Sequence, residues 1–345
     1  MTETKAHTRT RTHAVACFPA GDVDAPAALI DIETDVEEPG PRDLLVDVRA
    51  VSVNPVDVKV LAGADPGGAP KVLGWDAAGV VVAVGSEVSF FHVGDDVYYA
   101  GSIGRSGSNA DLHLVDERIV GHKPATLTFA EAAALPLTTI TAWETLFDRL
   151  ALTADSEGTL LVMGAAGGTG SMVVQLARQL TKVTVIGTAS RPESRAWARE
   201  LGVHHVVDHH DLVDAVNRVA PSGVDHVFTP FSAGKIESFA ELLRPRGAVV
   251  AIDDPPNLDL LPLKSKSITW HWEFMFSRPL DEPESIYQHE LLERVSTLVD
   301  DGILRSTLST SMDGLTAATV TEAHRLVESS ATIGKVVIVN SARQS

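Results

Sequence analysis

Residues Leu160–Leu180 read LLVMGAAGGTGSMVVQLARQL, and this segment decides the fold of the chain. A short apolar run leads into a glycine-rich turn, and the following residues place Val173, Leu176, Ala177 and Leu180 on one apolar stripe of a helix. Glycines in such a turn let the phosphates of a nucleotide approach the backbone N–H groups at the start of the helix. A flexible surface loop is the alternative interpretation. The pattern favours a strand, a turn and a helix that bind a nucleotide.

The bulk composition excludes several classes of protein. The chain has 345 residues, enough for about two domains, and its net charge of −18 repels nucleic acid and anionic membranes. Cys17 is the sole cysteine of this sequence, which excludes an intramolecular disulfide and a zinc site built from several cysteines. No apolar run approaches the ~18 residues of a membrane span. We therefore expect a cytoplasmic protein with a small-molecule partner and with no nucleic-acid or membrane partner.

The arrangement of strands and helices predicts two folds in one chain. Short strands separated by glycines are expected at Leu44–Val53, Ala78–Val84, Asp96–Tyr99 and Ala110–Val115. From residue 159 to residue 252 strands alternate with helices, which is typical of a parallel, doubly wound sheet. We expect a flexible tail over residues 1–12, a partly open β-barrel over 13–127, a nucleotide-binding domain over 128–270 and a return to the first domain over 271–345.

The residues about 20 positions after the glycines bear on the choice of cofactor. Folds that select NAD place an Asp or Glu there to hold the ribose 2′-hydroxyl. This chain has Ser190 and Arg191 instead, and Arg195 follows one helical turn later, so that a 2′-phosphate could be bound. Glu193 argues for NAD unless it only complements the helix dipole. The arginines could also be a solvated helix face. We expect NADPH as the cofactor.

Six motifs spread over the whole chain carry a family resemblance. They are Val51–Asp57 (VSVNPVD), Leu73–Val80 (LGWDAAGV), Gly94–Tyr98 (GDDVY), Leu135–Trp143 (LPLTTITAW), Gly164–Gly170 (GAAGGTG) and Ile333–Ile338 (IGKVVI). With them the chain resembles the medium-chain dehydrogenase/reductase superfamily, in its quinone-oxidoreductase-like branch. The segment Ile268–Phe276 is similar to a bacterial subgroup labelled zinc-binding alcohol dehydrogenase family. The resemblance implies an α/β protein with a GroES-like, partly open β-barrel domain, a Rossmann domain, a cleft between them and usually a homodimer.

The resemblance also implies a set of cofactor contacts. Besides the phosphate-selecting residues above, they are Gly164, Ala165, Gly167, Gly168, Thr169 and Gly170 at the pyrophosphate, His209 beside the adenosine phosphate, Thr138 and Thr141 near the nicotinamide, and Gly334 and Lys335 in the last strand.

The family label implies zinc, but the residues argue against it. Zinc members have three ligand motifs: a cysteine before a Thr/Ser-Asp pair, then Gly-His-Glu, then a second cysteine. In this chain Asn54 or its neighbours stand in place of the first cysteine, and Gly74-Trp75-Asp76 stands in place of Gly-His-Glu. No cysteine is near the place of the second one. A catalytic zinc needs about three protein ligands.

The other metal candidate is the stretch His204–His210, where adjacent residues of a strand would point to opposite faces. We expect exposed loop histidines there and no metal in the protein.

A reaction without zinc favours an acceptor that is already electrophilic. A secondary alcohol lacks the Lewis acid that lowers its pKa, whereas an enone or a quinone needs only orientation and a hydrogen bond to the developing oxyanion. Asn54 is our first candidate for that donor, with Lys59 and Tyr98 after it. Each has a structural alternative: Asn54 before a proline could shape a turn, Lys59 could be a solvated charge, and Tyr98 could be a core residue.

The aromatic segment near residue 272 is the candidate substrate contact. Trp270, Trp272, Phe274 and Phe276 alternate with period two, which predicts an extended stretch with one aromatic face. Trp272 and Phe274, together with Trp75, could line a pocket for a flat substrate, or the segment could be interface core. Three functions remain open at this point: an NADPH-dependent quinone or enone reductase, a zinc-type alcohol dehydrogenase, and a non-catalytic NADPH-binding redox sensor.

Overall fold

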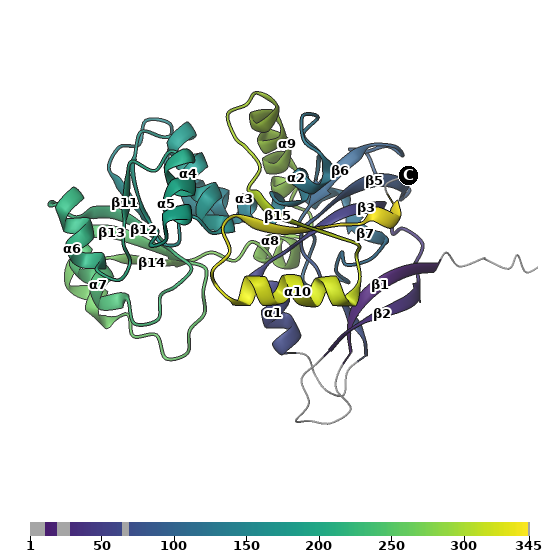
Figure 1. Ribbon diagram of the computed structural model, residues 1–345. Coiled ribbons are helices and arrows are strands. Elements are labelled where there is room, and N and C mark those ends of the chain that lie inside the picture. Colours follow the sequence, from purple (N-terminus) through teal and green to yellow (C-terminus); the bar gives the residue numbers. More distant parts are fainter. Residues whose placement is uncertain (1–10, 19–27, 64–68, 344–345) are drawn as a thin grey trace, which may run out of the picture. The chain divides into compact units, whose positions relative to one another are not determined.

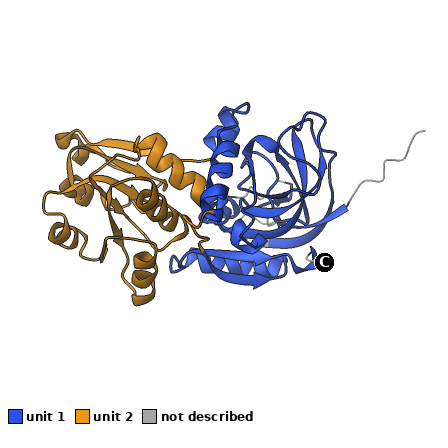
Figure 2. Ribbon diagram, turned by 90° about the horizontal axis from the view of Figure 1, so that it is seen from above, with its two compact units in different colours: residues 1–137, 276–300, 308–345 blue, residues 138–275, 301–307 orange. Residues whose placement is uncertain are grey.

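The computed structural model describes residues 11–18, 28–63 and 69–343. The chain divides into two compact units (Figure 2). Unit 1 comprises residues 1–137, 276–300 and 308–345, and unit 2 comprises residues 138–275 and 301–307. The predicted α/β class is confirmed, because unit 1 is built on mostly antiparallel sheets and unit 2 on a parallel sheet with helices.

The unit boundaries differ from those expected from the sequence, for two physical reasons. Helix α2 (Phe129–Ala133) packs on strands β3 and β5 of unit 1, so the first boundary lies at Leu137 rather than before residue 128. Residues 301–307 belong to unit 2 because the Gln175 side chain holds the backbone of Arg305 at both its N–H and its carbonyl.

The described residues of unit 1 form two sheets. The smaller has the order β2-β1-β4, and the larger has the order β15-β16-β3-β5-β6-β8, with β7 paired to β3. Their strands are β1 (Arg11–Phe18), β2 (Ala28–Asp35), β3 (Asp43–Val53), β4 (Lys71–Val72), β5 (Ala77–Val84), β6 (Asp96–Tyr99), β7 (Leu112–Asp116), β8 (Val120–His122), β15 (Leu308–Asp313) and β16 (Lys335–Val339). The helices of this unit are α1 (Pro55–Ala62), α2, α8 (Ser277–Asp281), α9 (Tyr287–Asp300) and α10 (Ala317–Glu328).

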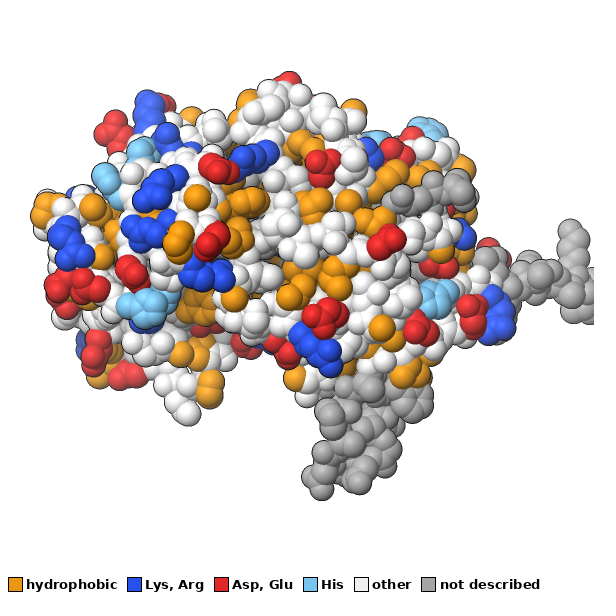
Figure 3. Space-filling view, in the orientation of Figure 1, with side chains coloured by type: hydrophobic (Ala, Val, Ile, Leu, Met, Phe, Trp, Pro, Cys, Tyr) orange, Lys and Arg blue, Asp and Glu red, His pale blue; other side chains and the backbone are white. Residues whose placement is uncertain are grey.

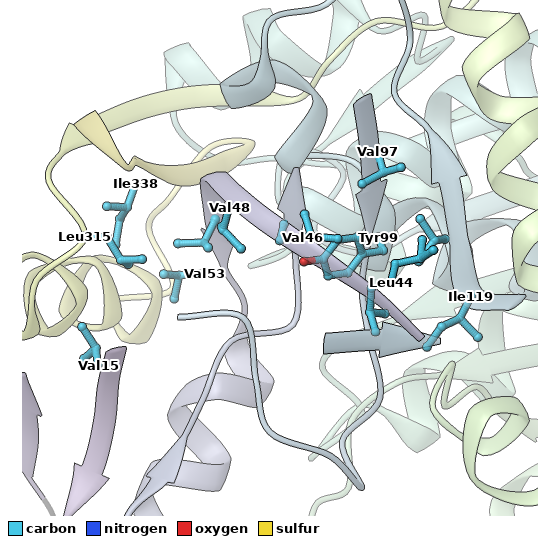
Figure 4. Packing of buried hydrophobic residues seen from close by; sticks show 14 of the residues in the cluster. Val15, Leu44, Val46, Val48, Val53, Val97, Tyr99, Ile119, Leu315 and Ile338 are labelled. Atoms are coloured by element: carbon cyan, nitrogen blue, oxygen red, sulfur yellow. The ribbon is translucent and has the colours of Figure 1, made fainter. Parts of the chain in front are cut away.

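One apolar cluster joins the strands of unit 1 that lie far apart in the sequence. The cluster includes Val46 and Val48 of β3, Val97 and Tyr99 of β6, and Ile338 of β16 (Figure 4). All five side chains are buried. Burial of apolar side chains is the main favourable term in folding. The cluster therefore holds together β3 and β16, and the polar residues described below lie at the end of β3 and at the start of β16.

Unit 2 is a doubly wound sheet with the strand order β11-β10-β9-β12-β13-β14, in which every pair is parallel. Its strands are β9 (Thr159–Val162), β10 (Thr184–Thr188), β11 (His205–Val207), β12 (Val224–Thr229), β13 (Leu243–Ala251) and β14 (Thr269–Trp272). Its α-helices are α4 (Gly168–Leu180), α5 (Pro192–Glu200), α6 (Leu212–Val219) and α7 (Ile236–Leu242). Figure 1 shows α4 and α5 on one side of this sheet and α6 and α7 on the other. Helix α3 (Pro136–Trp143) and a π-helical turn (Glu144–Arg149) precede the first strand.

Two local expectations need correction. The predicted tail over residues 1–12 ends too late, because Arg11 already begins β1; residues 1–10 lie outside the described part of the chain. The aromatic segment is not one extended stretch with a single aromatic face. Strand β14 ends at Trp272, Phe274 lies half exposed after it, and Phe276 is buried in unit 1.

The surface carries charges of both signs in close alternation, with histidines among them (Figure 3). On the face shown, the acidic side chains are not gathered into one patch. Within the described residues, no helix is both long and apolar enough to span a membrane.

Candidate functional site

The glycine turn after β9 has the backbone geometry that a phosphate cradle requires. Gly164 has φ +65°, in the left-handed region that favours glycine, and its N–H donates to Thr188 Oγ1 over 2.8 Å. A Cβ on Gly170 would overlap the carbonyl oxygen of Gly164, so the first turn of α4 can approach the loop only without a side chain there. Helix α4 starts at Gly168, after Gly167 as its N-cap. Its first N–H groups have no acceptor within the helix, as at the start of other α-helices.

The carboxyl ends of β9, β10 and β11 meet at one edge of the parallel sheet. Ser190 follows β10, and Arg191 is exposed at the N-cap of α5. Arg195 lies one turn further, but its guanidinium donates to the carbonyls of Ala189 (3.0 Å) and Val206 (3.2 Å). Arg195 therefore holds the ends of β10 and β11 together. Of the two predicted phosphate-binding arginines, Arg191 is the one whose side chain is exposed.

The remaining predicted cofactor residues fall into both units. Thr138 and Thr141 are buried on α3 and belong to unit 2. Gly334, with φ +57°, and Lys335 stand at the start of β16 in unit 1.

Lys335 is the centre of a buried polar network in unit 1. Its ammonium group donates to the carbonyl of Val53 (3.1 Å), to the amide oxygen of Asn54 and to Asp76 Oδ2 (2.9 Å). The Asn54 amide nitrogen donates to Asp76 Oδ2 (2.8 Å) and to the Trp75 carbonyl (3.2 Å). These contacts connect β16, the end of β3 and the segment between β4 and β5.

Two carboxyl groups of this network have raised pKa values. The Leu137 N–H donates to Asp76 Oδ1 over 2.7 Å, and burial raises the pKa of Asp76 although Lys335 acts in the opposite direction. Asp57, at the third position of α1, accepts the Asn54 N–H over 2.6 Å. Burial raises its pKa to about 7. Among the described residues, Asp57 Oδ1 has no hydrogen-bond partner. The network thus holds one cation, Lys335, and two acidic groups, Asp57 and Asp76.

The zinc that the family label implies does not fit these residues. The oxygen of Asn54 accepts from Lys335, Trp75 has no metal-ligand atom, and both Asp76 oxygens accept hydrogen bonds from this network. Cys17 is buried within β1, where burial raises the pKa of its thiol. A catalytic zinc needs about three converging nitrogen, sulfur or oxygen ligands. Here the ammonium group of Lys335 already neutralises the acidic side of the network.

The three predicted catalytic side chains differ in what surrounds them. Tyr98 is fully buried, and its hydroxyl donates to the carbonyl of Leu292 over 2.7 Å. Asn54 is 1% exposed and its amide lies within the network. Lys59 is exposed on α1. The geometry gives Asn54 and Tyr98 structural contacts, and the catalytic role of all three stays a prediction.

The predicted substrate contacts are likewise divided. Trp75 is fully buried in unit 1, with its ring edge-on to Phe276 at 6.1 Å. Trp272 and Phe274 belong to unit 2 and are 55% and 50% exposed. The structure therefore does not bring Trp75 into one exposed aromatic face with the other two.

His209 lies close to Asp208 and His210, although the sequence pattern predicted that adjacent residues there point to opposite faces. Strand β11 ends at Val207, so Asp208, His209 and His210 are on a bend and not on a strand. The expected alternation to opposite faces does not apply there, and ligand atoms of all three residues lie within 4.8 Å of one another. The reason given for few converging histidines was therefore wrong for these residues.

Sequence reasoning missed several polar residues at the strand ends of unit 2. Ser232, after β12, donates its N–H (2.6 Å) and its hydroxyl (2.9 Å) to Asp253 Oδ2, after β13. Phe231 is 52% exposed and lies against Gly164. These residues could have been found from the sequence, because each follows a predicted buried strand. Ligands of doubly wound sheets bind at the carboxyl ends of the strands.

Comparison with known proteins agrees with this architecture. Residues 201–338 match the model of a zinc-binding dehydrogenase, and residues 40–143 match that of an alcohol dehydrogenase GroES-like domain. A zinc-type alcohol dehydrogenase-like protein of Staphylococcus epidermidis is 38% identical over 314 residues, which are 88% of this chain and 92% of that protein.

Solved structures give the same result. A "putative zinc-dependent alcohol dehydrogenase protein" from Rhizobium etli is 47% identical with a TM-score of 0.89, and the match covers 96% of this chain and 98% of that one. Escherichia coli quinone oxidoreductase complexed with NADPH shares the fold at 24% identity and a TM-score of 0.80, over 95% and 99% of the two chains. The chain belongs to the medium-chain dehydrogenase/reductase superfamily, as an oxidoreductase of the family of zinc-type alcohol dehydrogenase-like proteins.

Proposed function

We propose that this oxidoreductase uses NADPH to reduce quinones or α,β-unsaturated carbonyl compounds and that it does so without zinc. The observation that carries the proposal is the buried contact of Lys335 with Asn54 and Asp76. A protein ammonium group occupies the network in which the family pattern would put metal ligands. A bound metal favours alcohol oxidation at neutral pH because it lowers the hydroxyl pKa, whereas conjugated carbonyls accept hydride at carbon without one.

The glycine turn and the end of β10 support the cofactor part of the proposal. Gly164 and Gly170 keep side chains out of the phosphate cradle, and Ser190 stands where NAD-selective folds place a carboxylate. Exposed Arg191 is suited to pair with a 2′-phosphate through two parallel N–H bonds. Bound NADPH would supply the hydride.

Lys59 is the best remaining candidate for the group that assists the acceptor oxygen. A quinone or enone that takes up a hydride develops negative charge on its oxygen and then takes up one proton. Asn54 and Tyr98 are buried, whereas Lys59 is exposed on α1, where an acceptor molecule from solution can reach it. We propose that Lys59 donates a hydrogen bond to this oxygen.

We also propose a homodimer that forms through β14. This strand is the last of the unit 2 sheet, so one of its edges has no strand beside it within the described chain. Trp272 is the last residue of β14 and Phe274 comes two positions after it, and each is about half exposed. An exposed edge strand with large apolar side chains is a typical surface for pairing with a second copy.

The alternative function is a zinc-type alcohol dehydrogenase, which the descriptions of the matching model and relative favour. The deciding experiment uses untagged protein that has been dialysed against EDTA and analysed for metal. Enones and quinones are supplied with NADPH, and the matching allylic alcohols are supplied with NADP+. We expect NADPH oxidation by enones or quinones at a rate that added EDTA does not change. Alcohol oxidation that exceeds enone and quinone reduction, or activity that returns only with zinc, would refute the proposal.

The contribution of Lys59 is measured in the same assay. Lys59→Met should lower kcat about tenfold or more and leave the Kd for NADPH unchanged, because the contact develops in the transition state. Lys182→Met, which removes another exposed lysine, is the control. An unchanged kcat would exclude this role for Lys59.

A further inference from the structure

Asp208, His209 and His210 form a compact group directly after β11. The Nδ1 atom of His210 lies 2.7 Å from Asp208 Oδ1, and Nδ1 of His209 lies 4.0 Å from the same oxygen. The two imidazole rings face each other with centroids 4.1 Å apart. Among the residues that the structure describes, this is the one group in which three such side chains bring ligand atoms within 4.8 Å of one another.

The donor set points to a particular class of ion. Two imidazole nitrogens and one carboxylate oxygen suit zinc, nickel and copper, whereas magnesium and calcium prefer oxygen ligands alone. Zinc binds such atoms at about 2.0–2.2 Å, which places them a little over 3 Å apart in a tetrahedral site. The short contact of His210 with Asp208 would open and the longer one of His209 would close, each by about 1 Å or less, which side-chain rotation on a bend allows.

The surroundings leave room for an ion and its water ligands. The side chains of Asp208 and His209 are each 43% exposed, and that of His210 is 73% exposed. The positive charge of Lys235 acts on His209 and opposes a cation, whereas the net charge of the chain favours one. Three protein ligands with an open fourth position are a known zinc arrangement.

We propose that Asp208, His209 and His210 bind one divalent ion of the zinc, nickel and copper class at the end of β11. This site is distinct from the buried network of Lys335, which lies in unit 1. The proposal does not depend on the reductase function, since it concerns binding of an ion in the absence of cofactor and substrate.

Isothermal titration of ZnCl₂ into untagged, EDTA-treated protein without cofactor tests the site. We expect one zinc ion per chain, no saturable binding of Mg²⁺, and at least about tenfold weaker zinc binding in Asp208→Asn and in His210→Ala, since even indirect partners of a metal contribute that much. His205→Ala is the matched control, because it removes an exposed histidine of β11 that does not belong to the group. Circular dichroism shows whether each variant remains folded.

Three results would overturn the proposal. One is the absence of saturable zinc binding by the wild-type protein. Another is binding that Asp208→Asn and His210→Ala leave as tight as in the wild type, which would place the ion at other residues. Equal losses in His205→Ala and His210→Ala would likewise show that the histidines act through the general charge of the surface and not as ligands.

Discussion

The ammonium group of Lys335 lies 2.9 Å from Oδ2 of Asp76, and both side chains are buried. This ion pair also includes Asn54, whose amide accepts from Lys335 and donates to the same carboxylate oxygen. Every member thus depends on the others for its hydrogen bonds. Networks of this kind are costly to break in part, because the remaining charge stays buried without its counterion.

Lys335→Met should therefore destabilise unit 1 strongly. We expect a loss of about 3–5 kcal/mol in the free energy of unfolding, because Asp76 would be left as a buried charge without a cation. The double variant Lys335→Met/Asp76→Asn should recover part of this loss. Urea denaturation measures both values. Lys182→Met breaks an exposed pair with Asp155 and should cost less than about 1 kcal/mol. A Lys335→Met variant as stable as this control would contradict the proposed importance of the network.

Arg191→Ala should change the choice of cofactor. Loss of a charge-assisted contact costs about 1.5–3 kcal/mol, so the Kd for NADPH should rise about ten- to a hundredfold while the Kd for NADH stays the same. Arg195→Ala should weaken both cofactors, because Arg195 holds the ends of β10 and β11 together. Fluorescence titration with each cofactor measures these constants, and Arg199→Ala, on the same helix, is the control. If NADH and NADPH lose affinity equally in Arg191→Ala, the residue does not contact the 2′-phosphate.

The sequence predicted those features that depend on local patterns. The strand at Asp96–Tyr99 has the expected bounds, and the segment Leu160–Leu180 forms β9, the turn and α4. Their apolar spacing and their glycines are contained within a few residues, so no distant contact is needed to recognise them.

Features that depend on distant contacts were not predictable in the same way. Lys335 and Asn54 are 281 positions apart, and nothing in either motif indicates that the ammonium group bonds to the amide. For that reason Asn54 could be chosen as a catalytic donor from the sequence, although the fold uses its amide internally. At His209 the error was local, because one bend after Val207 replaces the strand geometry on which the argument depended.

Trp272→Glu should shift the proposed homodimer toward monomers. In a two-fold interface each substitution occurs twice, so the new carboxylate on β14 of one subunit faces the same carboxylate on the other. The exposed apolar area of Trp272 is lost at the same time. Sedimentation velocity over a range of protein concentrations measures the effect. Leu261→Glu places the same charge on another exposed apolar residue of unit 2 and should leave the dimer intact. A wild-type protein that sediments as a monomer at every concentration would refute the dimer itself.

His324→Leu should reduce the loss of stability in mild acid. His324 is 3% exposed on α10, neither ring nitrogen has a hydrogen-bond partner in the described chain, and burial lowers its pKa to about 4. An unfolded histidine has a pKa of about 6.5, so the unfolded state binds more protons between these values, and the stability contributed by the neutral ring is lost as the pH falls from about 6.5 toward 4.

The substitution removes this group and fills its place with an apolar side chain of similar size, so the variant should be at least as stable as the wild type at pH 7. Its advantage should widen as the pH is lowered to 5, although His113, whose pKa burial also lowers to about 4, will keep part of the acid sensitivity in both proteins. Urea denaturation at pH 7, 6 and 5 measures the difference, with the exposed His92→Leu as the control. Parallel stability profiles for the wild type and His324→Leu over this range would show that His324 takes up its proton without disturbing the packing of α10.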